Sequence, residues 1–469
     1  SRFKLWYYPQ CPVVFMAATL ISSLKHLRTS QCCKRWAATA SALEQLPDVG
    51  QIFDVAPIPD VVVALEHCRA NRIRDYIGLA RLADRLVPEV PKVSITELVH
   101  LSSGFAALGA LNQPLFDAIA ASFLVARQSG ESLEPTSLVK VARAFASQRS
   151  RHVALFDSLS AMLDAPLISS LSPSDALSLL HSLAFLRLDT HCGEELWERL
   201  ENRALEPGLK TLGPGPVSEL CHILFISGRA SIRLEDISNM VEAIAAPVLA
   251  VQDSFWRETD GATLHWRLLM LRSCLRYLHR DTYHALSADA ARALRRVYRL
   301  EMPLREPRPS VSFVRKLSHI LTKIKVGHMC DVERGPLLFD VVERDRKLVY
   351  ECNHFDRFYT GTTAKIATSC LQERIVKAMG YRVVQIPHWQ WNKIRHKKQR
   401  IEYVRMSRYY AIKDRREFGP RDEQPADIAS NQFDYFGEYF FRKEAPQSSW
   451  SWYQPRYDAT KRLPERPSL

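Results

Sequence analysis

Apolar side chains recur at intervals of 40 residues across the first half of the chain. The positions that carry this step are Leu65, Phe105, Phe145, Phe185 and Phe225. Around the second of them, Leu98, Leu101 and Phe105 follow the i, i+3, i+7 spacing that places side chains on one face of a helix. A further aromatic residue stands eleven positions later in the best copies, at Phe116 and Phe156. Each 40-residue unit is therefore predicted to be a hairpin of two helices.

Helix hairpins of this kind cannot bury their apolar faces alone, and stacked neighbours form a solenoid with an extended concave surface. Residues 49–300 are predicted to form such an array. The repeating Phe and Leu side chains are expected to pack in its core rather than to touch a ligand. If the array binds a ligand on its concave surface, it would use polar residues of the inner helix face, which the sequence does not single out.

A change of periodicity after residue 300 marks a second domain. Three prolines in Glu301–Ser310 break the helical pattern, which predicts a linker at residues 301–312 and an α/β domain at residues 313–410. The expected elements are a helix at Phe313–Lys325, strands at Leu337–Val342 and Lys347–Cys352, a helix at Thr363–Met379 ended by Gly380, a strand at Tyr381–Pro387, an aromatic turn at His388–Trp391 and a basic helix from Lys393. The order after the first helix is thus ββαβα.

Composition and charge favour a polyanionic partner. The 64 Lys and Arg against 51 Asp and Glu give a net charge of +13, and cations that bind phosphates release counterions. Nucleic acid, an acidic membrane surface and an acidic protein would all suit this charge, and a basic organellar protein without a specific site would also show it. The ten cysteines include no C-x-x-C pair, so neither a zinc finger nor a disulfide scaffold is predicted.

Residues 1–48 have the composition of an organelle-targeting segment. No Asp or Glu occurs from Ser1 to Ala42, whereas six Lys or Arg are interspersed with Ser, Thr and Ala. The apolar run Val13–Leu24 is shorter than the roughly 20 residues that cross a bilayer. A secretory signal is the alternative interpretation of that run. We expect a location in the mitochondrial matrix and no membrane partner.

The segment Leu337–Arg405 resembles the RAP domain, a family named for RNA-binding proteins abundant in apicomplexans. The residues that carry the resemblance are Glu351, Asn353, Arg357 and Phe358 in ECNHFDRFY and the run GYRVVQIPHWQW at Gly380–Trp391, with its Ile-Pro and Trp. The resemblance implies RNA binding. It also implies that the preceding repeats are of the octotricopeptide-like or heptatricopeptide-like kind, although unrelated solenoids such as HEAT repeats have similar lengths.

The resemblance further implies a cellular role, as an RNA-binding structural component of the mitochondrial ribosome of an apicomplexan-like organism that holds short or fragmented ribosomal RNA. Neighbouring ribosomal proteins would contact the helical array and the C-terminal tail, residues 411–469. The aromatic clusters Gln432–Phe441 and Ser448–Tyr457 of that tail are suited to anchoring. A free organellar factor that stabilises, processes or helps to translate transcripts is the alternative.

RAP domains are thought to share the core of restriction-endonuclease-like nucleases, so a metal-dependent nuclease is a third hypothesis. Such an enzyme needs carboxylates that converge on a divalent cation. In this chain Asn353 stands where the resemblance places an Asp, and the next strand offers Gln385 without an acid or Lys beside it. Glu351 and Asp340 remain as carboxylates. We expect no enzymatic activity, no catalytic residue, no metal and no cofactor.

A basic run follows the last predicted strand. Residues Lys393–Arg416 contain ten Lys or Arg against two acids, with three tyrosines interleaved. Cations beside stacking rings favour single-stranded RNA, and a solvated helix face is the plain alternative. Trp391 is expected in the core, whereas Arg357, Tyr359 and His388 are expected to face the ligand. The predicted RNA-binding residues are Arg357, Tyr359, His388, Trp389, Lys393, Arg395, His396, Lys397, Lys398, Arg400 and Arg405.

Overall fold

The computed structural model describes residues 57–71, 76–110, 112–129, 134–189, 191–227, 234–300, 311–343 and 345–412. The predicted targeting segment, and nearly all of the predicted linker and tail, lie outside these residues. The chain divides into two compact units, Ser1–Ala110 and Leu111–Leu469. Both are helical in their described parts, and the second also contains a small sheet. No helix in the described ranges is long and apolar enough to cross a membrane.

The first unit contains α4 (Ile58–Ala70), α5 (Tyr76–Leu86), the 3-10 turn η2 (Val90–Lys92) and α6 (Ile95–Leu108). Ser94 and Glu97 begin α6 with a capping box, in which each side chain bonds the other residue's backbone N–H. Helix α4 packs against α6. Gly104 allows this approach, since a Cβ there would lie 3.0 Å from Leu65 Cβ.

The second unit begins with a succession of helices. They are α7 (Gln113–Gln128), α8 (Pro135–Ser147), α9 (Val153–Ser160), α10 (Ala165–Ser170), α11 (Pro173–Phe185), α12 (Glu194–Leu205), α13 (Leu209–Leu212), α14 (Pro214–Ile226), α15 (Leu234–Ala250), the 3-10 turn η3 (Phe255–Arg257), α16 (Thr259–Leu278), α17 (Arg280–Ala285) and α18 (Ala288–Arg299). Proline stands in the first turn of α8, α11 and α14, where its missing N–H costs no helical hydrogen bond. Helix α8 packs on α11, α11 on α14, and α14 on α16.

Phe185 of the 40-residue step is only partly buried, whereas the other aromatic residues of the step lie inside their units. Phe105, Phe145 and Phe225 are fully buried, and so are Phe116 and Phe156 of the second helices. Within the second unit, the Phe145 ring meets the edges of both Phe116 and Phe156, at centroid distances of 5.0 and 6.1 Å. The prediction that these side chains form the core is confirmed. The regular solenoid itself stays a prediction.

The sheet has four strands, β1 (Met329–Arg334), β2 (Leu337–Glu343), β3 (Leu348–Asn353) and β4 (Arg382–Pro387), in the order β1-β2-β3-β4. Strands β1, β2 and β3 are antiparallel, whereas β3 and β4 are parallel and pair Asn353 with Pro387 at their carboxyl ends. The predicted hairpin and third strand are confirmed. The predicted order lacked β1, because its side chains are mostly exposed and show no apolar alternation.

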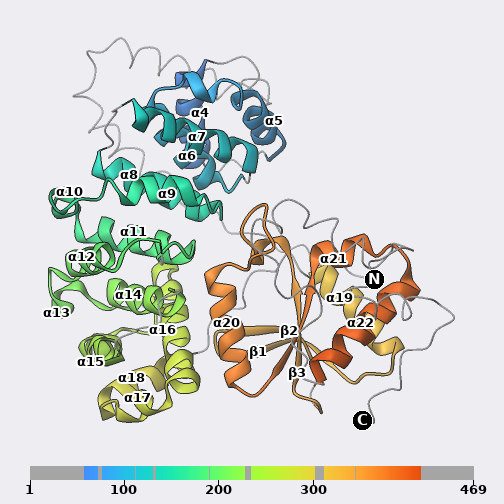
Figure 1. Ribbon diagram of the computed structural model, residues 1–469. Helices are drawn as coiled ribbons and strands as arrows, with labels where there is room; N and C mark the ends of the chain where they lie inside the picture. The colour runs from blue at the N-terminus through green and yellow to red at the C-terminus, as the bar shows by residue number, and fades with distance from the viewer. Residues whose placement is uncertain are drawn as a thin grey trace, which may run out of the picture. The chain divides into compact units, whose positions relative to one another are not determined.

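Helices cover both faces of this sheet (Figure 1). Helices α19 (Val311–Lys323) and α22 (Lys397–Ile412) share one core with β2, β3 and β4, and α20 (Ala367–Ala378) packs on the other side against β4. The predicted start of α20 at Thr363 was four residues early, because Phe358 and Lys365 pair as an isolated β-bridge before the helix begins. The expected aromatic turn is instead the short helix α21 (His388–Lys393).

Candidate nucleic-acid interface

Four of the predicted RNA-binding residues form an exposed basic stretch between α21 and the first turn of α22. They are Arg395, His396, Lys397 and Lys398. Lys397 and Lys398 lie on the exposed side of α22, whose opposite face is apolar, with Tyr403, Val404 and Met406 buried in the core. A helix with one buried stripe leaves its other face free for solvent or a ligand.

Helix α19 adds cations that the sequence interpretation missed. Its apolar side chains Leu317 and Leu321 enter the core shared with α22, while Arg315, Lys316 and Lys323 are exposed. The helix contains no Asp or Glu, so no carboxylate within it neutralises these charges. The Lys397 ammonium lies beside Lys323 and lowers the pKa of Lys323. We call the set Arg315, Lys316, Lys323, Arg395, Lys397 and Lys398 the basic surface.

Three predicted residues of this region are only partly exposed and support the helices. Arg400 donates to the Ile394 carbonyl at 2.7 Å, and its guanidinium stacks over the Trp391 ring. Trp391 is buried, as predicted. Arg405 pairs with Glu402 of the same helix at 2.7 Å. Lys393 also has an interaction partner. These cations are less available to phosphates than those of the basic surface.

Arg357 is only partly exposed, and its charge is paired within the α/β domain. Its guanidinium lies 3.8 Å from the Asp340 carboxylate, which is itself buried and accepts a hydrogen bond from Cys352 N–H at 2.8 Å. Although burial disfavours the charge, the nearby carboxylates, with Asp340 the strongest, raise the pKa of Arg357. The expectation that Arg357 faces a ligand does not match this placement, because its charge is already paired.

Tyr359 is buried between the end of α11 and the start of α20, contrary to the expectation that it faces a ligand. Its hydroxyl donates to the Phe185 carbonyl at 2.5 Å and accepts from Ala367 N–H at 3.1 Å. The adjacent Thr360 donates from its hydroxyl to the Gln148 carbonyl at 2.7 Å and from its N–H to the Arg149 carbonyl at 2.9 Å. The last carbonyls of a helix lack partners within the helix. Tyr359 and Thr360 therefore cap α11 and α8.

His388 and Trp389 form a ring cluster with Phe358. Trp389 is buried, and its ring meets that of Phe358 edge-on at 4.4 Å. His388 is half-buried, with ring centroids 6.1 Å from Phe358 and 6.0 Å from His354. Burial, and then the charge of His354, lower the pKa of His388, which favours its neutral form. Neither side chain is placed as an exposed stacking platform or as an added cation.

The carboxylates considered for metal binding are held in an internal ion network. Lys365 donates to Glu351 at 2.7 Å and to Glu373 at 2.8 Å, and all three side chains are largely buried. Gln385 and Lys377 also donate to Glu373. Although burial opposes both charges, the mutual attraction raises the pKa of Lys365 and lowers that of Glu373. These carboxylates are neutralised by the chain's own cations.

Asn353 lies at the carboxyl end of β3, where the nuclease hypothesis needs an acid. Its side chain is fully buried, and neither its amide nitrogen nor its oxygen has a hydrogen-bond partner among the described residues. Across the described part of the chain, no group of three or more His, Cys, Asp or Glu is placed to hold a metal ion. The described geometry thus offers RNA a charged surface and offers no assembled metal centre.

Comparison with known families gives this geometry a context. Residues 350–406 match the RAP domain. The RAP domain is one to which RNA binding is ascribed. The matched residues begin in β3 and continue through α20, β4 and α21 into α22. They include three of the six residues of the basic surface, whereas α19, β1 and β2 lie outside the match. No curated protein matches the chain.

The cations of α19, which the sequence interpretation did not identify as RNA-binding residues, lie outside the part that matches the RAP domain. Arg315, Lys316 and Lys323 precede it by more than two dozen residues. A signal was present, since the expected helix Phe313–Lys325 contains four Lys or Arg and no acid. Only the packing of α19 against α22 shows that both groups of cations belong to neighbouring helices.

Proposed function

We propose that the chain is an RNA-binding protein that holds RNA by its phosphates on the basic surface. The observation that carries this proposal is the packing of α19 against α22, two neighbouring helices that both expose Lys and Arg side chains. Placing two ammonium groups together is unfavourable without an anion between or beside them. A polyphosphate chain supplies such anions at regular spacing and releases counterions when it binds.

The placement of the rings refines the kind of RNA recognition proposed. Trp389 and Tyr359 are buried, so stacking on bases would have to come from elsewhere. Contacts to phosphates fix the position of a nucleic acid but carry no sequence information directly. Binding by this surface is therefore expected to depend strongly on salt and weakly on base sequence.

The proposal includes no catalytic step, so the protein is proposed not to be an enzyme. Phosphodiester hydrolysis by this kind of domain would need carboxylates free to bind a divalent cation. Glu351 is occupied by Lys365, Asp340 by Arg357 and Cys352 N–H, and Asn353 carries no charge. These contacts support a binding role for the domain. Accumulation of cleaved RNA that depends on magnesium and on Glu351 would contradict it.

The cellular role that we propose is a structural component of the mitochondrial ribosome that grips fragmented ribosomal RNA. The acid-free N-terminal composition supports a mitochondrial matrix location, and stacked helices of a solenoid would supply surface for neighbouring ribosomal proteins. A free organellar RNA-binding factor is the alternative. Sedimentation of tagged protein tests the difference, because a ribosomal component should travel with large particles. Recovery in light fractions alone would favour the free factor.

The RNA-binding test compares two triple variants of the full chain. Lys323→Ala, Lys397→Ala and Lys398→Ala together remove three exposed cations of the basic surface. Each phosphate contact contributes about 0.7 to the salt slope for single strands, so the slope should fall by about 2. At about 1 kcal/mol per exposed pair, the affinity should fall roughly a hundredfold. Fluorescence anisotropy with a labelled single-stranded RNA would measure both.

The matched control is Arg280→Ala, Arg295→Ala and Arg299→Ala on α17 and α18, which removes three exposed cations elsewhere. Both variants lose the same net charge. The control should keep RNA affinity within about threefold of the unmodified chain, since long-range effects of single exposed charges are screened at physiological salt. Equal weakening in both variants would show that binding follows the total charge and not the basic surface.

A further inference from the structure

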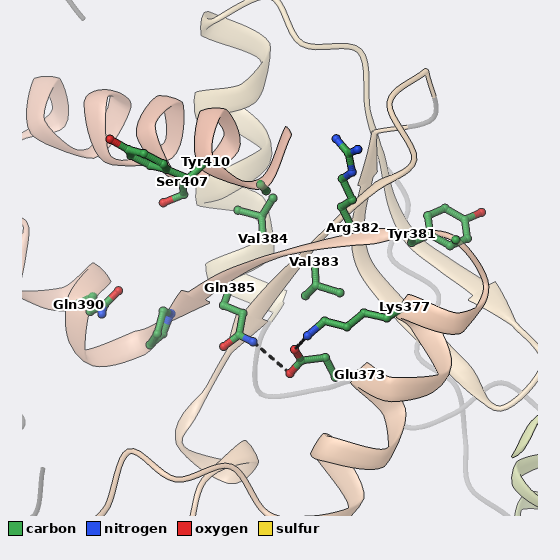
Figure 2. A pocket seen from close by; sticks show the side chains of 13 residues that line it. Glu373, Lys377, Tyr381, Arg382, Val383, Val384, Gln385, Gln390, Ser407 and Tyr410 are labelled. Carbon is green, nitrogen blue, oxygen red and sulfur yellow. Dashed lines mark hydrogen bonds and ion pairs between the residues drawn. The ribbon is translucent and has the colours of Figure 1, made fainter. Parts of the chain in front are cut away.

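A groove runs along β4, the strand at one end of the sheet order. Its volume is about 770 Å³, and its residues come from β4 and the flanking helices α20 and α22. Figure 2 shows β4 passing between these helices, with Val384 directed toward α22 and with Val383 and Gln385 directed toward α20. We call this hollow the β4 groove. It is separate from the basic surface, with which it shares no residue.

The backbone of β4 presents unused hydrogen-bonding groups to this groove. Arg382 N–H donates to the Lys347 carbonyl at 2.9 Å, so residues 382, 384 and 386 turn their backbone groups toward β3. Alternate residues of a strand turn theirs to the other side. The N–H and C=O groups of Val383 and Gln385 thus face the groove, and no hydrogen bond engages them within the described part of the chain. Such an edge is a template for another strand.

The two edges of the sheet differ in how they discourage pairing. On β1, Asp331, Glu333 and Arg334 are exposed, and charged side chains on an edge strand hinder the approach of a second strand. On β4 only Arg382 is an exposed charged residue, and Val383 and Gln385, which present their backbone to the groove, are uncharged. The β4 edge is therefore the one suited to strand addition.

The charges around the groove specify what would bind. The net charge near the groove is +1, from three cations, Lys365, Lys377 and Arg382, and two carboxylates, Glu351 and Glu373. On the α20 wall, Lys377 is paired with Glu373 at 2.5 Å, whereas Arg382 is exposed and donates to the Ile412 carbonyl at the end of α22. An acidic side chain thus suits the α22 side beside Arg382, and an apolar one suits the α20 side beside Val383. The buried Glu373 carboxylate and the single net charge make the groove less suited to RNA than the basic surface.

We infer that the β4 groove binds an extended segment of a partner protein, which adds a fifth strand to the sheet. Successive side chains of a strand point to opposite faces, so the segment would alternate acidic residues toward α22 with apolar residues toward α20. Pro387 ends the edge because it has no N–H. The paired part of the partner is then about five residues long, from the length of β4. This inference does not rest on RNA binding.

The test uses a random 12-residue peptide library displayed on phage and selected on the full-length chain. Val383→Pro removes an outward N–H that takes no part in the sheet, and Pro is tolerated on edge strands when its N–H side faces solvent. Val383→Thr keeps the N–H and the branched shape, and it is the control. Selected peptides should share the alternating apolar and acidic pattern. They should bind Val383→Pro roughly tenfold more weakly or worse, and Val383→Thr within about twofold.

A second measurement keeps the test decisive if Val383→Pro fails to fold. Hydrogen exchange of the unmodified chain with a selected peptide bound should slow in residues 382–387. Several results would overturn the inference: no enriched peptide, equal binding to both variants, or unchanged exchange in β4. Displacement of the peptides by single-stranded oligouridine would make RNA the occupant. If the unmodified chain formed dimers and Val383→Pro abolished them, the occupant of the β4 groove would be a second copy of the chain.

Discussion

Replacing Tyr359 with Phe separates the sequence-based interpretation of this residue from its place in the structure. The sequence suggests a ring that faces RNA, whereas the structure buries the side chain and leaves it 1% exposed. Phe fills the same space and keeps the edge-on contact with the Phe185 ring, at a centroid distance of 6.5 Å. The substitution therefore removes the hydroxyl group and little else.

The magnitude follows from the two hydrogen bonds of that hydroxyl. Without it, the Phe185 carbonyl loses a donor at 2.5 Å and Ala367 N–H loses an acceptor at 3.1 Å. A buried donor or acceptor left without its partner costs about 1–3 kcal/mol. The free energy of unfolding should accordingly fall by roughly 2–5 kcal/mol, and the RNA affinity of the folded protein should not change.

Chemical denaturation and RNA anisotropy on the same preparations would check both expectations. Tyr409→Phe is the matched control, because the Tyr409 ring is only half-buried on α22 and its hydroxyl makes no recorded hydrogen bond in the described ranges. Its effect on stability should stay within about 0.5 kcal/mol. If Tyr359→Phe weakened RNA binding and left stability unchanged, the hydroxyl would meet RNA and the described burial would be refuted.

Two further predictions concern buried ionisable side chains. Arg408→Ala leaves the buried Glu343 carboxylate without a guanidinium that binds it at 2.8 and 2.6 Å, so the free energy of unfolding should fall by about 3–5 kcal/mol. Arg405→Ala breaks the more exposed pair with Glu402 and should cost less than about 1 kcal/mol in urea denaturation, and equal losses would contradict burial as the cause. Burial, followed by the charges of neighbouring groups, lowers the pKa of His222 to about 3 from 6.5, so the unfolded chain gains a proton first as the pH falls. The contribution of His222 to the free energy of unfolding is then fully present above about pH 6.5 and should fall by about 2 kcal/mol at pH 5. Urea titrations at pH 7 and pH 5 would measure the loss, and His222→Phe should lose about 2 kcal/mol less between these two pH values than the unmodified chain.

Strand and helix periodicity predicted most of the α/β domain, and it failed where elements are short or exposed. Strands β2, β3 and β4 are short, mostly apolar runs rich in Val, Ile, Leu and aromatic residues, so they were identifiable. Strand β1 has Asp331, Glu333 and Arg334 on an open edge and carries no comparable signal. Helix α21 has six residues, too few for a 3.6-residue period to appear.

The candidate interface could be predicted only where it lies within one segment. The exposed stretch from Arg395 to Lys398 is visible as a run of cations, and the structure keeps it on the surface. Lys323 is 74 residues away from Lys397 in the sequence and becomes its neighbour only because α19 and α22 share a core. Tyr359 bonds a carbonyl 174 residues earlier, at a helix end whose position no local pattern indicates.

The hydrogen bonds from Tyr359 and Thr360 to the array restrict where the chain can change in length during evolution. Their acceptors, the carbonyls of Gln148 and Phe185, lie at the ends of α8 and α11. Two adjacent residues can reach both acceptors only while these helix ends stay in register. Insertions and deletions between Gln148 and Phe185 should therefore be rare among homologues. Those that do occur should bulge away from these helix ends, for example in the loop between α9 and α10.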